Sequence, residues 1–436
     1  MRPLLSICIP TYNRASLLEL TLENVLAQTK GLPDVEVVVS DNASTDHTQE
    51  ILARHSGILT DRLDRTVGIT RNIEHAVCDM ASGKYVWIVG DDDLVIGGAL
   101  ARVLAFLRAH PDLGYVYLNF GWIDANNRET TIRLRGSIPE VNPLTEWMFQ
   151  DFTEKVLPRL EDLAVLPCGN PSLLFSLLIC YVATRDMYLQ RWRSLEPSDN
   201  LDGSSTLIDD CNPHGKVVTE TFAGCPVGYL GDPCILQGIN GWHWKSYAIK
   251  NNLFGTGQFL TWLEGTAFAR EALERLWDSF YGMAGDLFFQ MLENPGEHLG
   301  KELVLEKVVQ PGIRHGAFWE RFLETARRFH DRDYEVRLLL EEALAVLEGA
   351  GGRPRIGVWG SMGRGTCLIL ELQKRGWPVA WVGDKVADLH GAALEKTGLV
   401  ISPVETLASL DLDLLLLAVN RTRLQQVEAM LEPWRG

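Results

Sequence analysis

The chain has 436 residues and a formal net charge of −16, and its 46% hydrophobic and 22% charged residues are ordinary for a soluble globular protein. This length accommodates two or three domains. The negative charge argues against a nucleic-acid scaffold, which needs a basic face, and against broad attraction to anionic lipid.

The first 120 residues alternate apolar, strand-like runs with amphipathic helical stretches. Strands are predicted at Leu4–Pro10, Val35–Val39, Tyr85–Val89 and Gly114–Phe120. Helices are predicted from Ser16 with a capping box to Glu19, after Asp46, and at Gly68–Met80 and Ala99–Ala109. This order predicts an α/β fold with a mostly parallel sheet covered by helices on both faces.

Three adjacent carboxylates, Asp91, Asp92 and Asp93, follow the strand at Tyr85–Val89. The polar loops after Pro10 and around Asp41 are expected to open on the same sheet edge, where α/β proteins bind ligands. Clustered carboxylates suit Mg²⁺ or Mn²⁺, which also bind the phosphates of a nucleotide. The alternative is a solvated turn whose acids cap the next helix.

Residues 123–251 follow no regular pattern, but two features stand out. The apolar run Phe175–Thr184 predicts a buried strand or helix at the far side of the sheet. Two polar-aromatic loops contain His214, Trp242 and His243, which could contact a sugar or an acceptor through stacking and edge hydrogen bonds. Alternatively, the tryptophans only fill the open side of the sheet.

Residues 265–348 are strongly helical and predict a helical subdomain that makes a homodimer plausible. After a glycine-rich linker, a strand at Arg355–Trp359 leads into a turn that contains Gly360, Gly363 and Gly365. Asp384 follows about 20 residues later, as a ribose-binding acid would. These residues predict a second nucleotide site, although such turns also form for tight packing alone. The expected domains are 1–255, 256–349 and 353–436.

The eight cysteines do not have the spacing of zinc ligands. In a chain of this size they are expected to be reduced thiols of a cytoplasmic protein. No apolar stretch approaches the roughly 20 residues that a membrane span needs. We therefore expect a chain without a transmembrane segment. A peripheral contact with the inner face of the membrane is compatible with this expectation.

Four motifs at strand-to-loop junctions make the N-terminal part resemble the family-2 glycosyltransferases of the GT-A fold. They are Ser6–Arg14, Val37–Asp46, Gly68–Asn72 and Gly90–Asp93. The Gly-Asp-Asp-Asp form, with Asn-Pro-His at 212–214 and Gly-Tyr-Leu-Gly at 228–231, is most similar to the abequosyltransferase-like branch.

The resemblance implies roles for the matching residues. Pro10, Tyr12 and Arg14 would line the nucleotide pocket, Asp41 would accept a hydrogen bond from the base, and Gly68 and Asn72 would border the nucleotide. Asp91 and Asp92 would bind the nucleotide sugar, and Asp93, with Asp91, would hold the metal ion.

Inverting enzymes of this kind need a base that takes the proton of the acceptor hydroxyl. Asp209 or Asp210 is the candidate, and either could instead cap a turn. The C-terminal part resembles the small Rossmann-like domain attached to some sugar C-methyltransferases and acetyltransferases, which implies an accessory role.

The expected function is metal-dependent, inverting transfer of a sugar from a UDP-, dTDP-, GDP- or CDP-sugar to a hydroxyl acceptor. The acceptor would be a surface polysaccharide, a lipid-linked glycan or a protein. One alternative is a non-catalytic nucleotide-sugar-binding or scaffold protein. Another is a nucleotidyltransferase, which would be expected to carry a glycine-rich basic loop where this chain has Pro10–Arg14.

Overall fold

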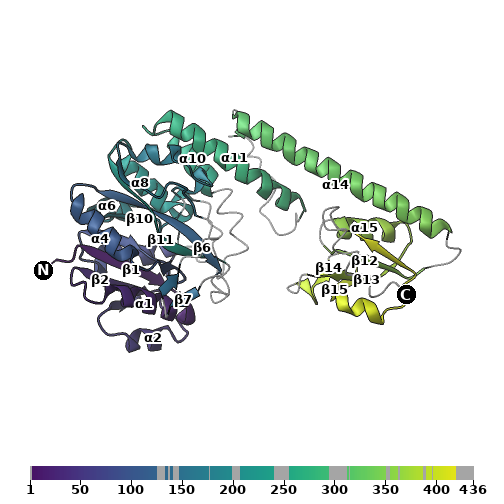
Figure 1. The fold of residues 1–436 in the computed structure, drawn as a ribbon, viewed down its shortest axis with the longest axis horizontal. Coiled ribbons are helices and arrows are strands. Elements are labelled where there is room, and N and C mark those ends of the chain that lie inside the picture. The colour runs from purple at the N-terminus through teal and green to yellow at the C-terminus, as the bar shows by residue number, and fades with distance from the viewer. Residues whose placement is uncertain are drawn as a thin grey trace. The chain divides into compact units, whose positions relative to one another are not determined.

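The chain forms two compact units in the computed structural model (Figure 1). The first comprises Met1–Leu287 and Asn294–Arg321, and the second comprises Phe288–Glu293 and Phe322–Gly436. The structure describes residues 2–124, 133–135, 138–140, 147–175, 177–198, 207–239, 255–293, 312–313, 315–349, 354–361, 364–385, 389–394 and 396–418. The three-part division expected from the sequence stays a prediction.

The first unit is built on a nine-stranded sheet whose N-terminal half is parallel. Its strands are β1 (Leu5–Thr11), β2 (Val35–Asp41), β3 (Leu59–Arg62) and β4 (Tyr85–Ile88), in the order β3-β2-β1-β4. The register pairs Thr11 with Asp41 and Cys8 with Ile88. The loops after β1, β2 and β4 therefore open on one edge, as predicted.

The other half of the sheet is mixed, in the order β4-β10-β6-β11-β5, and β9 pairs with β11. The strands are β5 (Leu94–Val95), β6 (Tyr115–Asp124), β9 (Glu154–Leu157), β10 (Tyr181–Thr184) and β11 (Val227–Ile239). Strands β7 (Arg133–Arg135) and β8 (Ile138–Glu140) form a separate antiparallel pair. The buried run Phe175–Thr184 does contain a strand, but its position at the far side of the sheet was wrong. Strand β10 lies antiparallel between β4 and β6, in the middle of the sheet.

Helices join these strands and cover the sheet. The first are α1 (Ala15–Thr29), α2 (Thr48–Arg54), α3 (Ile69–Glu74), the π-helix η1 (His75–Met80) and α4 (Ala99–Ala109). The capping box predicted from Ser16 to Glu19 was wrong, because α1 begins at Ala15 with Arg14 as its N-cap and no side-chain cap from that residue. The carboxylate of Asp46, from the next loop, accepts the Ala15 N–H at 3.0 Å instead.

Further short and long helices complete the first unit and lead into the second. They are η2 (Leu160–Val165), η3 (Pro171–Leu173), α6 (Arg185–Arg191), η4 (Trp192–Ser194), α7 (Ile208–Cys211), α8 (Pro213–Phe222), α10 (Thr256–Leu263), α11 (Arg270–Glu293) and α14 (Gly316–Gly349). Among the helices that the structure describes, none combines the length and apolarity needed to cross a bilayer.

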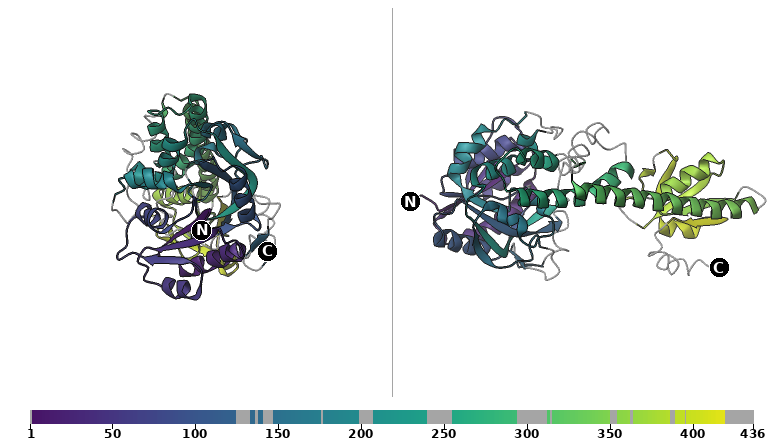
Figure 2. Two further views of the ribbon diagram at one scale, coloured as in Figure 1. Left: turned by 90° about the vertical axis from the view of Figure 1, so that its left-hand side faces the viewer. Right: turned by 90° about the horizontal axis from the view of Figure 1, so that it is seen from above.

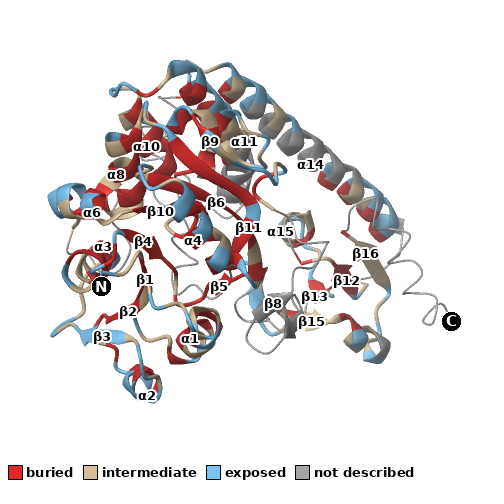
Figure 3. Ribbon diagram, turned by 60° about the vertical axis from the view of Figure 1, so that its left-hand side comes forward, coloured by how far each residue is buried: buried red, intermediate tan, exposed pale blue. Residues whose placement is uncertain are grey.

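The central strands supply much of the hydrophobic core of the first unit. Every residue of β1 and β4 is buried, so both faces of these strands are covered (Figure 3). Continuous apolar strands of this kind are typical of parallel sheets between helices. None of the eight cysteines, all of which lie in described segments, forms a disulfide.

The second unit has a five-stranded sheet in the order β14-β15-β13-β12-β16. The strands are β12 (Ile356–Trp359), β13 (Val379–Asp384), β14 (Ala393–Leu394), β15 (Leu399–Pro403) and β16 (Leu414–Leu417), with α15 (Arg364–Lys374) and η8 (Val404–Ser409). All are parallel neighbours except β14. Leu340 and Leu347 place the end of α14 in the core of this unit (Figure 2). Its parallel strands, β15-β13-β12-β16, follow the order 3-2-1-4, which is the first part of the order of a doubly wound sheet.

Candidate functional site

The acidic loop, Gly90–Asp93, leaves β4 at the carboxyl edge of the parallel half. Arg14 Nη1 lies 2.9 Å from Asp91 Oδ1 and 3.1 Å from Asp92 Oδ2. Thr11 Oγ1 donates to Asp91 Oδ2 at 2.8 Å. Burial lowers the pKa of Arg14, but the two carboxylates outweigh this and raise it. The chain thus supplies one cation of its own to the clustered acids.

Asp93 faces the backbone instead. Its Oδ2 accepts the Gly90 N–H at 2.7 Å, and its Oδ1 accepts the Gly238 N–H at 2.9 Å. Burial, and then repulsion from Asp92, raise the pKa of Asp93 to about 8. A Cβ at position 238 would stand 2.3 Å from the Asp92 carbonyl oxygen, so the close approach of β11 to this loop requires glycine.

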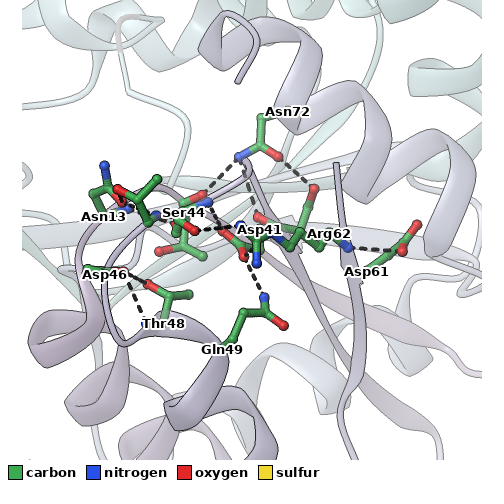
Figure 4. A network of polar contacts seen from close by, with 12 residues as sticks. Asn13, Asp41, Ser44, Asp46, Thr48, Gln49, Asp61, Arg62 and Asn72 are labelled. Atoms are coloured by element: carbon green, nitrogen blue, oxygen red, sulfur yellow. Dashed lines mark hydrogen bonds and ion pairs between the residues drawn. The ribbon is translucent and has the colours of Figure 1, made fainter. Parts of the chain in front are cut away.

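Asp41 ends β2 beside Thr11 and is fully buried. Its Oδ1 accepts the Ser44 N–H at 2.9 Å, and its Oδ2 accepts Gln49 Nε2 at 2.5 Å (Figure 4). Arg62 Nε lies 3.8 Å from Oδ2. A fully buried carboxylate with these donors is a fixed acceptor at the sheet edge. Sequence reasoning identified Asp41 but not Gln49 or Arg62.

The loops after β1 and β2 are joined by hydrogen bonds close to Asp41. The Asn13 N–H donates to Ser44 Oγ at 2.9 Å, and Asn13 Oδ1 accepts the Thr45 N–H at 2.7 Å (Figure 4). Asn13 and Ala43 adopt positive φ values of 52° and 57°. Backbone strain of this kind persists only where surrounding contacts hold it, and it gathers at functional sites.

The remaining nucleotide-side candidates lie on the same edge. Asn72 on α3 is buried, and its Oδ1 accepts Ser40 Oγ at 2.6 Å. Gly68 is the N-cap of α3. Pro10 is buried within β1, whereas Tyr12 is 41% exposed. Tyr12 is therefore an aromatic side chain that a ligand at this edge could reach.

Asp209 and Asp210, the candidate bases, contact a different segment. Asp209 Oδ1 accepts Lys216 Nζ at 2.7 Å and its Oδ2 accepts the Glu196 N–H at 2.9 Å. Asp210 Oδ2 accepts Ser198 Oγ at 2.7 Å. Both carboxylates thus anchor residues 196–198, and a role as base stays a prediction.

Three further sequence candidates belong to the first unit and one to the second. His214 is buried near the start of α8. Trp242, His243 and Gly363 lie outside the described residues.

In the second unit, Asp384 Oδ2 accepts the N–H and Oγ of Ser361, at 2.9 and 2.7 Å. A Cβ at Gly365 would meet the Gly360 carbonyl oxygen at 1.6 Å. Tight packing thus accounts for the glycine at position 365, while a nucleotide role stays a prediction.

The acidic loop offers hard oxygen donors to a divalent cation. Within the described part of the chain, no group of three or more His, Cys, Asp or Glu is arranged to hold a metal ion. Mg²⁺ usually takes only one or two protein carboxylates when substrate phosphates supply the other ligands. The residues therefore fit a cation that is shared with a phosphate ligand, rather than one held by the protein alone.

The family model described as Glycosyl transferase family 2 matches residues 6–181. This segment belongs to glycosyl transferase family 2. The match covers β1 through Tyr181, and so includes Arg14, Asp41 and the acidic loop. It does not reach Asp209, Gly238 or the second unit. The family-2 segment thus carries the parallel half of the sheet and most of the candidate site.

Two named glycosyltransferases are similar to parts of this chain. Abequosyltransferase RfbV of Salmonella typhimurium is 29% identical over 242 residues, which is 53% of this chain and 66% of that protein. A PGL/p-HBAD biosynthesis glycosyltransferase of Mycobacterium bovis is 36% identical over 132 residues, 28% of this chain and 50% of that one. The chain therefore matches between half and just under two thirds of these relatives' length. The crystal structure of S. aureus TarS 1-349 aligns with a TM-score of 0.46 at 14% identity, over 74% of this chain and 81% of that one.

Proposed function

We propose that the chain transfers a sugar from a nucleoside-diphosphate sugar to a hydroxyl group of an acceptor. The observation that carries this proposal is the convergence of Asp41, Arg14 and the acidic loop at one carboxyl edge of a family-2 segment. The names of the two sequence relatives, both glycosyltransferases, support the same class of reaction.

The nucleotide would lie across the ends of β1, β2 and β4. Asp41 would accept a hydrogen bond from an N–H of the nucleotide base in place of the one from Gln49. The exposed ring of Tyr12 would stack on the base. The diphosphate would then lie toward Arg14 and the acidic loop. Arg14 can pair with phosphate oxygens through its planar fork of donors.

Mg²⁺ or Mn²⁺ would be held by carboxylate oxygens of the acidic loop together with the diphosphate. We favour Asp91 or Asp92 as its protein ligand over Asp93, because the donors to Asp93 are fixed backbone N–H groups. Thr11 and Arg14, which donate to Asp91 and Asp92, do so through side chains that can turn aside for a cation. A cation bound there would offset the charge that develops on the departing diphosphate. Arg14 lies beside the same oxygens and would add to this effect.

Direct displacement, with inversion at the sugar, needs a base for the acceptor hydroxyl. Asp209 and Asp210 remain the proposed candidates, and either would have to release residues 196–198 before it could act. A cytoplasmic location, a peripheral membrane contact and an accessory role for the second unit also stay proposals.

Release of nucleoside diphosphate from a panel of UDP-, dTDP-, GDP- and CDP-sugars, with Mn²⁺ and a lipid-linked glycan extract, tests the proposal. The full chain should release one diphosphate faster than Asp91→Asn by at least about 100-fold. Asp64→Ala, which replaces an exposed acid after β3, serves as the matched control and should release it at the wild-type rate. Binding of a nucleotide sugar without any turnover would favour the non-catalytic alternative.

A further inference from the structure

One side of α1 carries a buried row of polar side chains, Thr21, Asn24 and Gln28. Their spacing of three and four residues puts them on one face of the helix. Thr21 and Asn24 are fully buried, and Gln28 is half-buried. Burying these polar groups costs desolvation free energy that apolar residues would not cost. The polar groups therefore need hydrogen-bond partners that offset it.

Those partners are backbone groups of the acidic loop and of the strand that follows it. Thr21 Oγ1 lies 3.0 Å from the carbonyl oxygens of both Asp91 and Asp93, so that its one proton is shared between them. Both of these backbone oxygens belong to residues of the candidate site.

Asn24 binds Val95 as a neighbouring strand would. Its Nδ2 donates to the Val95 carbonyl at 3.0 Å, and its Oδ1 accepts the Val95 N–H at 2.8 Å. Gln28 Nε2 donates to the same carbonyl at 2.8 Å. Val95 belongs to β5, the last strand in the order of the sheet, which pairs with β11 on its other side. Asn24 thus occupies the open edge of the sheet.

We propose that Thr21, Asn24 and Gln28 are positioning residues that set where the carboxylates of Asp91–Asp93 stand. Helix α1 and the residue before it contact both the side chains and the backbone of the loop. Arg14, just before α1, contacts the side chains of Asp91 and Asp92, while Thr21 contacts the loop backbone. A shift of the backbone would move the carboxylates away from Arg14 and from a bound diphosphate. This inference rests on the proposed function, because its consequence is weaker binding of the donor.

The test is calorimetric titration of the full chain with UDP, dTDP, GDP and CDP, each with Mn²⁺, using the diphosphate that binds the wild type most tightly. Thr21→Val keeps the shape of the side chain and removes the hydroxyl, and it should weaken that binding about tenfold. Thr21→Ser keeps the hydroxyl and should restore it to within about twofold. Thr29→Val is the matched control, because among the described residues the Thr29 hydroxyl bonds to Leu26, within α1.

A merely structural role predicts a different pattern, in which Thr21→Val lowers the Tm while the diphosphate binds with wild-type affinity. That result would overturn the inference. If Thr21→Val does not fold, Gln28→Met at the half-buried position decides, with weaker binding expected and wild-type affinity as the contrary result. Failure of the wild type to bind any of the four diphosphates would instead count against the proposed function itself.

Discussion

The carboxylate of Asp93 accepts the backbone N–H of Gly238 at 2.9 Å, across 145 residues of sequence. Asp93 lies inside the segment that the family model matches, whereas Gly238 lies on β11, outside it. This bond ties the acidic loop to the second half of the sheet. The candidate site is therefore completed by a strand that the shared family segment does not contain.

Asp93 should make stability depend on pH. Its pKa is raised from 3.8 to about 8 in the folded chain, so between these values the folded state holds a proton that the unfolded state has lost. This contribution is fully present below about pH 4 and is lost as the pH rises toward 8. Urea unfolding in EDTA at pH 5, 6, 7 and 8 should show a steeper fall in the free energy of unfolding for the wild type than for Asp93→Asn. Equal slopes would contradict the burial of an ionisable Asp93.

Arg14→Met should destabilise the metal-free chain by about 2–4 kcal/mol, because Asp91 and Asp92 lose a buried cationic partner. Mn²⁺ should then raise the Tm of the variant more than that of the wild type, since the cation replaces the missing charge. Arg54→Met is the control. It removes an exposed pair with Glu19 and should cost at most about 1 kcal/mol. An equal rise in Tm with Mn²⁺ in wild type and Arg14→Met would show that Arg14 and the metal ion do not share these carboxylates.

Asp46→Ala should lower the free energy of unfolding by about 1–2 kcal/mol. Its Oδ2 accepts the Ala15 N–H and its Oδ1 accepts the Thr48 N–H, so one carboxylate serves the first turns of both α1 and α2. Ser16→Ala should change little, since Ser16 is not the cap of α1. Chemical denaturation of both variants measures this, and a larger loss for Ser16→Ala would reverse the assignment.

Gly365→Ala should destabilise the second unit by at least about 2 kcal/mol, because the new methyl group would overlap the Gly360 carbonyl oxygen. Gly316→Ala, at the first residue of α14 and in the first unit, has open space around its Cβ and controls for the added methyl group itself. Hydrogen exchange along β12 and α15 reports the loss directly. Unchanged protection in Gly365→Ala would mean that packing does not explain this glycine.

The parallel half of the sheet could be predicted because its information is local. Each apolar strand, such as Leu4–Pro10, runs straight into polar loop residues, and parallel pairing then brings those loops to one edge. The position of β10 could not be predicted, since an apolar run says that a strand is buried but not which strands flank it. The predicted cap of α1 was wrong for the same reason, because the acceptor, Asp46, comes from another loop.

In the candidate site too, residues with a local sequence signal could be predicted, whereas their distant partners could not. Asp41 and Asp91–Asp93 stand at strand ends and could be found from the sequence, whereas the partners that fix them are distant. Gly238 gave no local signal. Thr21, Asn24 and Gln28 did carry one, because polar residues recur on the face of α1 that also carries Leu18 and Val25.

The most direct test of the central claim is calorimetric titration of the full chain with UDP, dTDP, GDP and CDP, in Mn²⁺ and in EDTA. The account predicts that one diphosphate binds in Mn²⁺, at least about tenfold more weakly in EDTA, and at least about tenfold more weakly to Asp91→Asn. Binding that is unaffected by both EDTA and Asp91→Asn, or no binding of any diphosphate, would contradict a nucleotide-sugar site at the acidic loop.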